Sequence, residues 1–150
     1  MSGTQTSAAT ALVTGGTGLL GSHIAQQLHQ RGVGVRALCR AGSDTAFLQT
    51  LGAEIVHGDI TDGAVLPAAC AGVDAVYHAA ARVGDWGPWP DFVRTSIQGT
   101  QCLLDAAADA RVRRFLHISS ISVYGHVNGE GLILDERAPL GVRLPRWSYY

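Results

Sequence analysis

Residues 11–21 read Ala11-Leu-Val-Thr-Gly-Gly-Thr-Gly-Leu-Leu-Gly21, an apolar run followed by closely spaced glycines. The glycines fit either Gly16-x-Gly18-x-x-Gly21 or Gly15-x-x-Gly18-x-x-Gly21. Such a pattern lets a buried strand turn tightly into a helix, with room for a pyrophosphate beside the backbone. The free amides at the start of that helix attract the phosphates. The pattern therefore predicts dinucleotide binding, although a plain tight turn can carry the same glycines.

Short apolar runs alternate with helical patterns along the rest of the chain. The predicted strands are Thr10–Val13, Val33–Cys39, Glu54–His57, Asp74–His78 and Arg114–Ile118. The predicted helices are Gly18–Arg31, Asp44–Leu51, Asp62–Ala69 and Asp91–Ala110. Alternation with short links indicates right-handed crossovers between parallel strands. We therefore expect a doubly wound, three-layer Rossmann-type α/β fold with strand order 3-2-1-4-5, lacking its C-terminal strands and substrate domain.

Local signals mark the ends of these elements. Asp44, Asp62 and Asp91 stand where helices are expected to begin, as caps or first-turn acids. Gly32 and Gly52 follow two predicted helix ends, where a left-handed residue is favoured. Periodicity disappears from Gly125 to Arg146, which predicts a long loop.

Composition limits the class of protein. The 150 residues are 47% hydrophobic and 15% charged, which suits one domain with a large interior. A net charge of −1 without a basic run argues against nucleic-acid and membrane partners. Neither a signal peptide nor a spanning helix is indicated. The scattered cysteines (Cys39, Cys70 and Cys102) and histidines indicate a reducing compartment and no metal, so we expect a cytoplasmic protein.

The end of the second predicted strand selects the type of dinucleotide. NAD binding favours an acid about 20 residues after the glycines, which accepts hydrogen bonds from the ribose hydroxyls. Here the strand ends in Cys39 and Arg40. A guanidinium at this place can hold a 2′-phosphate, so Arg40 favours NADP, with NAD possible. The alternative is an arginine that is simply solvated.

Four segments together resemble the extended short-chain dehydrogenase/reductase family, of the NAD-dependent epimerase/dehydratase type. They are Val13–Gly21, Gly58–Asp62, His78–Ala81 and His117–Gly125. The resemblance implies an NAD(P)-dependent enzyme. In such an enzyme an acidic residue after the third strand binds adenine, and small residues at the end of the fourth strand lie beneath the cofactor. The cofactor-binding residues it implies are Gly15, Thr17, Gly18, Leu19, Leu20, Gly21, Arg40, Asp59, Ile60, Ala79, Ala80, Ala81 and Ser119.

The resemblance also implies catalytic residues. Ser120 matches the serine that hydrogen-bonds the substrate oxygen, while Tyr124 is expected to be a wall residue. Family members use a Tyr-x-x-x-Lys motif in which the lysine lowers the pKa of the tyrosine. This sequence reaches Tyr149 and Tyr150 where that motif should begin, and Tyr150 is the preferred choice. All eleven basic residues are arginines, so residues 1–150 are expected to be a domain truncated before the catalytic lysine, and inactive alone.

Two positions in the fourth predicted helix stand out. Relatives usually carry asparagine where this chain has Ser96, whose shorter side chain could still bridge through water. Gly99 lies in mid-helix at a cost near 1 kcal/mol, which suggests close approach to a neighbouring strand.

Residues 79–89 resemble a loop of the 3β-hydroxysteroid dehydrogenase and dihydroflavonol reductase branch. Trp86 and Trp89 place apolar surface on it, which implies a bulky apolar substrate unless the tryptophans only pack beneath the loop. Three functions remain open: an NADP(H)-dependent oxidoreductase, a nucleotide-sugar epimerase or dehydratase, and a non-catalytic nucleotide-binding module. The resemblance further implies a small-molecule partner and a possible homodimer.

Overall fold

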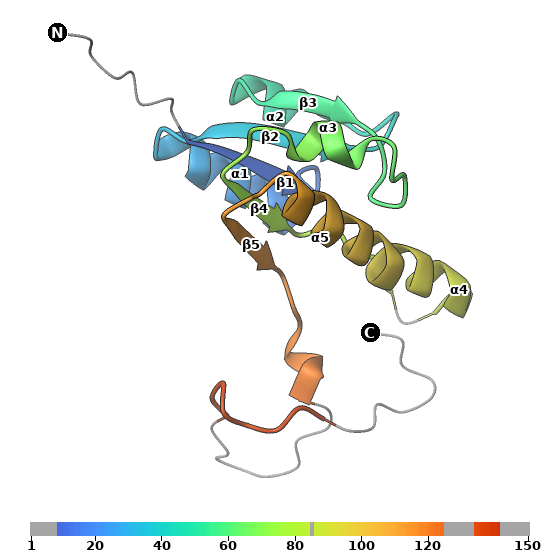
Figure 1. The fold of residues 1–150 in the computed structure, drawn as a ribbon. Helices are drawn as coiled ribbons and strands as arrows, with labels where there is room; N and C mark the ends of the chain where they lie inside the picture. The colour runs from blue at the N-terminus through green and yellow to red at the C-terminus, as the bar shows by residue number, and fades with distance from the viewer. Residues whose placement is uncertain (1–8, 85, 125–133, 142–150) are drawn as a thin grey trace, which may run out of the picture.

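The computed structural model describes residues 9–84, 86–124 and 134–141. Its centre is a parallel sheet in the order β3-β2-β1-β4-β5, as predicted (Figure 1). The strands are β1 (Thr10–Thr14), β2 (Gly34–Cys39), β3 (Glu54–His57), β4 (Ala75–His78) and β5 (Arg114–His117). The chain order reverses between β1 and β4, because the first crossovers lead to β2 and β3 and the next returns to the other side of β1. Ligands bind outside the carboxyl ends of the strands at such a point.

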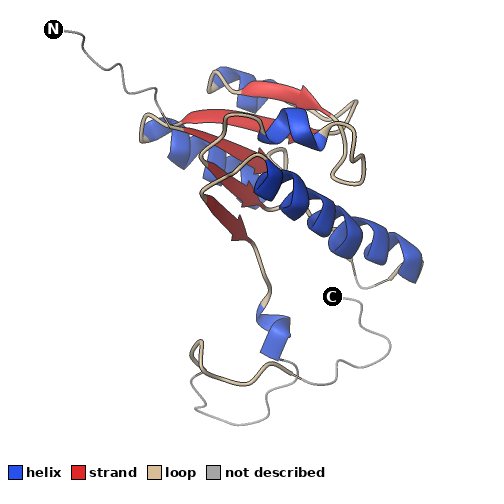
Figure 2. Ribbon diagram, viewed as in Figure 1, coloured by secondary structure: helices blue, strands red, loops and turns tan. Residues whose placement is uncertain are grey.

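Helices cover both faces of the sheet, which gives the predicted three layers (Figure 2). They are α1 (Leu19–Gln30), α2 (Ala46–Thr50), α3 (Leu66–Cys70), α4 (Trp89–Phe92), the π-helix η1 (Val93–Gly99), α5 (Thr100–Asp109) and the short 3-10 helix η2 (Ile121–Tyr124). In Figure 1, α3 and α5 lie on the near face of the sheet and α1 on the far face. No helix in the described ranges has the length and apolar character needed to cross a membrane.

Each face of the sheet has its own apolar core, because alternate residues of a strand point to opposite faces. In β1, Ala11 and Val13 pack toward α1 with Ala25 and Leu28. Leu12 packs in the other direction, in a cluster that includes Leu66, Leu103 and Val76. The central strand is therefore buried on both sides and holds the glycine turn at its end in a fixed position.

Gly32 and Gly52 lie just past helix ends, as predicted, but the helices predicted to begin at Asp44, Asp62 and Asp91 begin at other residues. Gly32 and Gly52 have φ of +72° and +67°, and the residue after each donates its amide to a carbonyl five residues earlier. Asp62 does not begin α3: its Oδ1 accepts the Ala64 amide in a separate turn, and α3 begins only at Leu66. Similarly, Asp44 accepts the Ala46 amide from one residue before the N-cap of α2. These carboxylates bond to the backbone two residues ahead, which forms a turn and not a cap.

The fourth predicted helix is continuous but irregular. It begins at Trp89 and not at Asp91, because Pro90 fits the first turn of a helix, where no amide bond is lost. Asp91 lies in this first turn, as expected. Its middle section, η1, has the wider π spacing that is often found at functional sites. Of the predicted loop after Gly125, residues 134–141 are described, and they contain neither helix nor strand.

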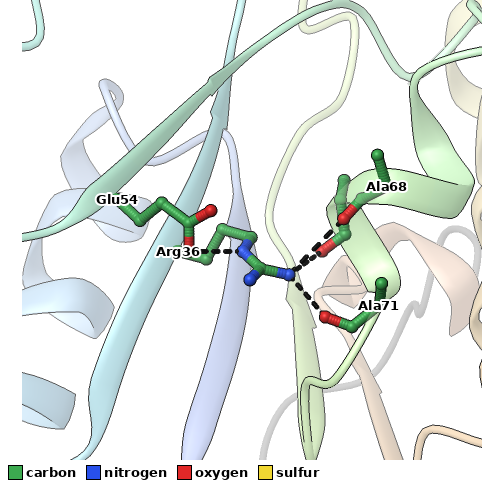
Figure 3. Close-up of polar contacts among 5 residues, drawn as sticks. Arg36, Glu54, Ala68 and Ala71 are labelled. Carbon is green, nitrogen blue, oxygen red and sulfur yellow. Dashed lines mark hydrogen bonds and ion pairs between the residues drawn. The ribbon is translucent and has the colours of Figure 1, made fainter.

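Arg36 ties α3 to the sheet from the middle of β2 (Figure 3). Its Nε bonds to Glu54 Oε2 on the neighbouring strand at 2.7 Å. Its Nη1 donates to the carbonyls of Ala69 at 3.0 Å and Ala71 at 2.7 Å, with Ala68 at 3.5 Å. A guanidinium therefore satisfies the carbonyls at the end of a five-residue helix, where the negative end of the helix dipole lies. This arginine serves the fold, unlike the three that line the cavity described next.

Candidate cofactor-binding site

A cavity of about 600 Å³ opens at the carboxyl ends of β1, β2, β3 and β4. The structure brings together there all but one of the predicted cofactor-binding residues. Those that line the cavity are Gly15, Thr17, Gly18, Leu19, Leu20, Gly21, Arg40, Asp59, Ile60, Ala79, Ala80 and Ala81. Ser119 is exposed and is not among the lining residues. Its assignment stays a prediction that this geometry does not favour.

The glycine turn uses the Gly15, Gly18, Gly21 reading of the motif. Gly15 has φ of +70°, and a Cβ there would lie 2.8 Å from the Ala79–Ala80 peptide. A Cβ on Gly21 would collide with the Gly15 carbonyl. Gly16 faces elsewhere and lines a second cavity of about 410 Å³ with Phe47 and Leu48. Only small residues allow β1, α1 and the end of β4 to meet this closely.

The first turn of α1 offers free backbone donors to the cavity. Gly18 is the N-cap, and no acidic residue lies in the first turn. In the described part of the chain, no acceptor is seen for the amides of Leu19, Leu20 and Gly21. Uncapped amides at the positive end of a 12-residue helix suit a pyrophosphate. The residues present therefore fit the phosphates of a dinucleotide.

The β2 end of the cavity carries a free guanidinium. The Arg40 side chain is exposed, and its guanidinium has no hydrogen-bond or ion-pair partner within the described ranges. The carbonyl of Arg40 accepts the Ser43 amide at 3.1 Å, and this turn brings Ser43 to the cavity as well. Among the described lining residues, the only carboxylate belongs to Asp59, which follows β3. Sequence reasoning missed Ser43, which no motif marks.

Asp59 has a local structural role as well as a place in the cavity. Its Oδ1 accepts the Thr61 amide at 2.9 Å and the Thr61 hydroxyl at 2.8 Å. No partner is seen for its second carboxylate oxygen in the described structure. Ile60 is buried against Gly99 of η1, where a Cβ would lie 2.9 Å from Ile60 Cγ1. The close approach expected at Gly99 is therefore present. Its partner is Ile60 in the loop after β3, and not a residue within a strand.

Two further arginines line the cavity where the loop after β4 meets η1, and sequence reasoning missed both. Arg82 Nη2 lies 3.7 Å from Asp91 Oδ2, and Arg94 Nη2 lies 3.6 Å from Asp91 Oδ1. Arg82 also stacks over the ring of Phe92 at 5.2 Å. Its amide donates to Ser96 Oγ at 3.2 Å. The Ser96 side chain thus reaches the backbone of Arg82 directly, and this contact needs no bridging water.

His78, at the end of β4, is 1% exposed and was given no individual role from the sequence. Its Nδ1 lies 2.7 Å from Thr14 Oγ1 and its Nε2 lies 2.9 Å from Thr100 Oγ1. Burial, together with the nearby His117, lowers the pKa of His78 to about 4. The imidazole is therefore neutral at pH 7 and is held between two hydroxyls. The feature of the sequence that could have pointed to His78 is a histidine at the end of an apolar strand, where burial is expected.

The predicted catalytic serine lies beyond the end of β5, beside η2. Ser120 Oγ lies 3.1 Å from Ser122 Oγ and accepts the Ser122 amide at 3.2 Å. Tyr149 and Tyr150 lie outside the described residues. Tyr124 is partly buried, and its hydroxyl lies 3.4 Å from the Asp135 carbonyl; its role as a wall residue stays a prediction. Within the described ranges, no group of three potential metal ligands occurs.

Comparison with known proteins identifies this arrangement. The model of the NAD dependent epimerase/dehydratase family matches residues 11–149. A 4-hydroxy-2-methyl-3-oxo-4-farnesyl-3,4-dihydroquinoline-1-oxide ketoreductase from Stigmatella aurantiaca is 37% identical over 132 residues, or 87% of this chain and 39% of the relative. Sterol demethylase protein B from Methylococcus capsulatus is 39% identical over 123 residues, or 81% of this chain and 37% of the relative. The chain thus spans about two fifths of the length of these relatives.

Solved structures agree in fold. The chain superposes on UDP-glucose-4-epimerase from Stenotrophomonas maltophila with a TM-score of 0.80 and 30% identity, over 93% of this chain and 44% of that one. A short-chain dehydrogenase/reductase superfamily protein from Agrobacterium tumefaciens, with bound NAD, gives a TM-score of 0.74 and 37% identity, over 87% of this chain and 38% of that one. The Rossmann-like sheet, the glycine turn and the matched family model lead to one conclusion. This chain belongs to the NAD dependent epimerase/dehydratase family of NAD(P)-dependent, extended short-chain dehydrogenase/reductase enzymes.

Proposed function

We propose that the protein is an NADP(H)-dependent oxidoreductase that transfers hydride between nicotinamide and the hydroxyl or carbonyl carbon of a bulky apolar substrate. The observation that carries this proposal is the Arg40 guanidinium at the β2 end of the cavity, which has no partner among the described residues, while the one carboxylate among the described lining residues, that of Asp59, follows β3 and not β2. A 2′-phosphate binds well to a guanidinium, whereas ribose hydroxyls are held better by an acid.

In this proposal the glycine turn and the first amides of α1 hold the pyrophosphate, and Asp59 lies nearest to the adenine. When bound, the nicotinamide gives or takes the hydride. Ser120 hydrogen-bonds the substrate oxygen, and Tyr150, or alternatively Tyr149, exchanges the proton with it. A phenol titrates near 10, so this role requires a cationic neighbour at neutral pH.

The apolar substrate class rests on the loop after β4 and on the relatives. Val83 is 71% exposed and Trp86 is 80% exposed, so apolar side chains stand in solvent next to the strand end that lines the cavity. The names of the relatives include a farnesyl-dihydroquinoline ketoreductase and a putative dihydroflavonol 4-reductase from Synechocystis. These are reductases named for large, ring-containing compounds.

The competing function is epimerisation or dehydration of a nucleotide sugar. It is favoured by the structural similarity to UDP-glucose-4-epimerase and by a dTDP-glucose 4,6-dehydratase from Streptomyces niveus that is 34% identical. The two functions differ in redox balance, because an epimerase returns the hydride to its substrate and consumes no nicotinamide. We expect the whole protein to oxidise NADPH with bulky apolar ketones, seen as loss of nicotinamide absorbance. Turnover of sugar nucleotides without that loss would establish the alternative.

Arg40→Gln tests the cofactor assignment. We expect it to weaken NADPH binding about tenfold or more, since a charge-assisted contact to the 2′-phosphate is lost, and to leave NADH binding nearly unchanged. Nicotinamide fluorescence titration measures both dissociation constants. Arg31→Gln, at the far end of α1, is the matched control for loss of one positive charge. Equal weakening with both nucleotides, or a wild-type preference for NADH, would contradict the role of Arg40.

A further inference from the structure

A line of hydrogen bonds runs from β1 to η1 through the buried ring of His78. The Ala80 amide donates to Thr14 Oγ1 at 3.3 Å, and Thr14 Oγ1 lies 2.7 Å from His78 Nδ1. On the other side of the ring, His78 Nε2 lies 2.9 Å from Thr100 Oγ1. Thr100 Oγ1 in turn donates to the Ser96 carbonyl at 2.8 Å. We call this line the His78 relay.

Each hydroxyl has one hydrogen, and this decides the direction of the whole relay. The Thr100 hydrogen is used on the Ser96 carbonyl, so Thr100 Oγ1 accepts from His78 Nε2–H. His78 Nδ1 then carries a lone pair and accepts from the Thr14 hydroxyl, whose oxygen is free to accept the Ala80 amide. Only the neutral ring protonated on Nε2 satisfies every donor. A second proton on Nδ1 would leave the Thr14 hydrogen without this buried acceptor.

The relay joins three walls of the cavity. The first is the glycine turn, where Gly15 lies so close to the Ala79–Ala80 peptide that no side chain fits between them. The second is the end of β4, which supplies the Ala80 amide. The third is η1, where Ser96 also accepts the Arg82 amide. His78 and Thr100 do not line the cavity, so they influence a ligand only through these walls.

We propose that His78 is a positioning residue for the cofactor, and that the relay from Thr14 to Thr100 sets the spacing between the glycine turn, the end of β4 and η1. The inference rests on the proposed function, because it takes the nicotinamide nucleotide as the ligand of the cavity. A ring that is locked in one tautomer by two hydroxyls gives these walls a single arrangement, since any shift would break a buried hydrogen bond.

The decisive variant is Thr100→Val, which removes the last hydroxyl of the relay while preserving side-chain shape. We expect NADPH to bind about tenfold more weakly, equivalent to about 1.4 kcal/mol, by fluorescence titration at a temperature where the variant is folded. Thr100→Ser keeps the hydroxyl and should restore wild-type affinity. Thr50→Val is the matched control, because the Thr50 hydroxyl donates to the Phe47 carbonyl within its own short helix and Thr50 does not line the cavity.

A second readout does not depend on the variant being folded. Nitrogen NMR of the wild-type chain should show His78 neutral and protonated on Nε2. Protonation on Nδ1, or wild-type affinity in Thr100→Val, would overturn the proposal.

A wild-type chain that bound neither NADPH nor NADH would contradict the proposed function instead. Hydrogen exchange of backbone amides would then test the relay independently of nucleotide binding. Faster exchange of the Ala80 and Arg82 amides in Thr100→Val would support it, and unchanged exchange would overturn it.

Discussion

At the scale of single residues, the site depends on groups whose ionisation is controlled by burial. His78 is the clearest case, because its ring lies between two hydroxyls and no carboxylate from the described part of the chain bonds to it. The charged groups and aromatic rings that face it from β5 are His117, with ring centroids 5.3 Å apart, and Phe115, at 6.0 Å. A positive charge on His78 is thus disfavoured first by desolvation and then by the neighbouring histidine.

This lowered pKa predicts how stability depends on pH. The unfolded chain takes up a proton at His78 near the ordinary pKa of about 6.5, whereas the folded chain takes it up only near a pKa of about 4. The contribution of His78 is therefore fully present above pH 6.5 and is lost as the pH falls from there toward 4. The loss approaches ~1.4 kcal/mol per pH unit and totals on the order of 3 kcal/mol.

Urea unfolding at a series of pH values measures this dependence. His78→Gln should be less stable at pH 7 but should lose less stability on acidification between pH 6.5 and 4. His29→Gln, on the exposed surface near the end of α1, serves as the control for removal of a histidine. If His78→Gln and wild type showed the same slope, the buried ring would not be the group responsible.

At the scale of elements, the short helix α3 is held by a side chain of the sheet, that of Arg36. The five residues of α3 cannot form a stable helix alone, because helix nucleation is costly. Arg36 reaches this helix from β2 and bonds to its last carbonyls, while Glu54 balances its charge (Figure 3). The arginine side chain is only 17% exposed, so these contacts are partly shielded from water.

Arg36→Met should therefore destabilise the fold by about 1–3 kcal/mol, because it keeps much of the apolar stem but leaves helix carbonyls and Glu54 without their donor. The free energy of unfolding in urea measures the change. Arg31→Met is the matched control, since the exposed Arg31 side chain donates to Gln27 within α1, and it should change stability by less than about 0.5 kcal/mol. Equal effects of the two substitutions would show that α3 does not need its arginine.

At the scale of the whole molecule, two apolar cores pack on opposite faces of one sheet, and each core contains one buried cysteine. Cys39 belongs to the core beneath α1, and Cys70 belongs to the core beneath α3 and α5. Burial raises the pKa of both thiols, and for Cys70 the charge of Arg36 partly opposes this effect. Cys102 is exposed on α5.

A thiol reagent should accordingly label Cys102 at once and label the two buried cysteines only when the molecule opens. Because both cores pack on the same strands, Cys39 and Cys70 should become reactive together as urea increases. Mass spectrometry of peptides resolves the three sites, and Cys102→Ser removes the fast signal. Early labelling of Cys39 alone would indicate that the face with α1 opens independently.

The sheet, its strand order and the place of the glycine turn could all be predicted from local pattern. Alternating apolar runs, Gly32 and Gly52 at helix ends and the spacing of residues 11–21 are properties of neighbouring residues, so they can be read directly from the chain. The same holds for Arg40 and Asp59, because each follows a predicted strand and strand ends of a parallel sheet share one edge.

What local pattern could not supply are contacts between residues far apart in the chain. The contacts of His78 with Thr14 and Thr100, the contact of Ser96 with Arg82, and the placement of Arg94 at the cavity arise only when β1, β4 and the helix from η1 into α5 pack together. The same is true of Arg36, which looks like any strand arginine until α3 lies beside it. Hydrogen-bond direction and burial depend on three-dimensional neighbours, so tertiary structure decided which polar residues line the cavity and which hold its walls.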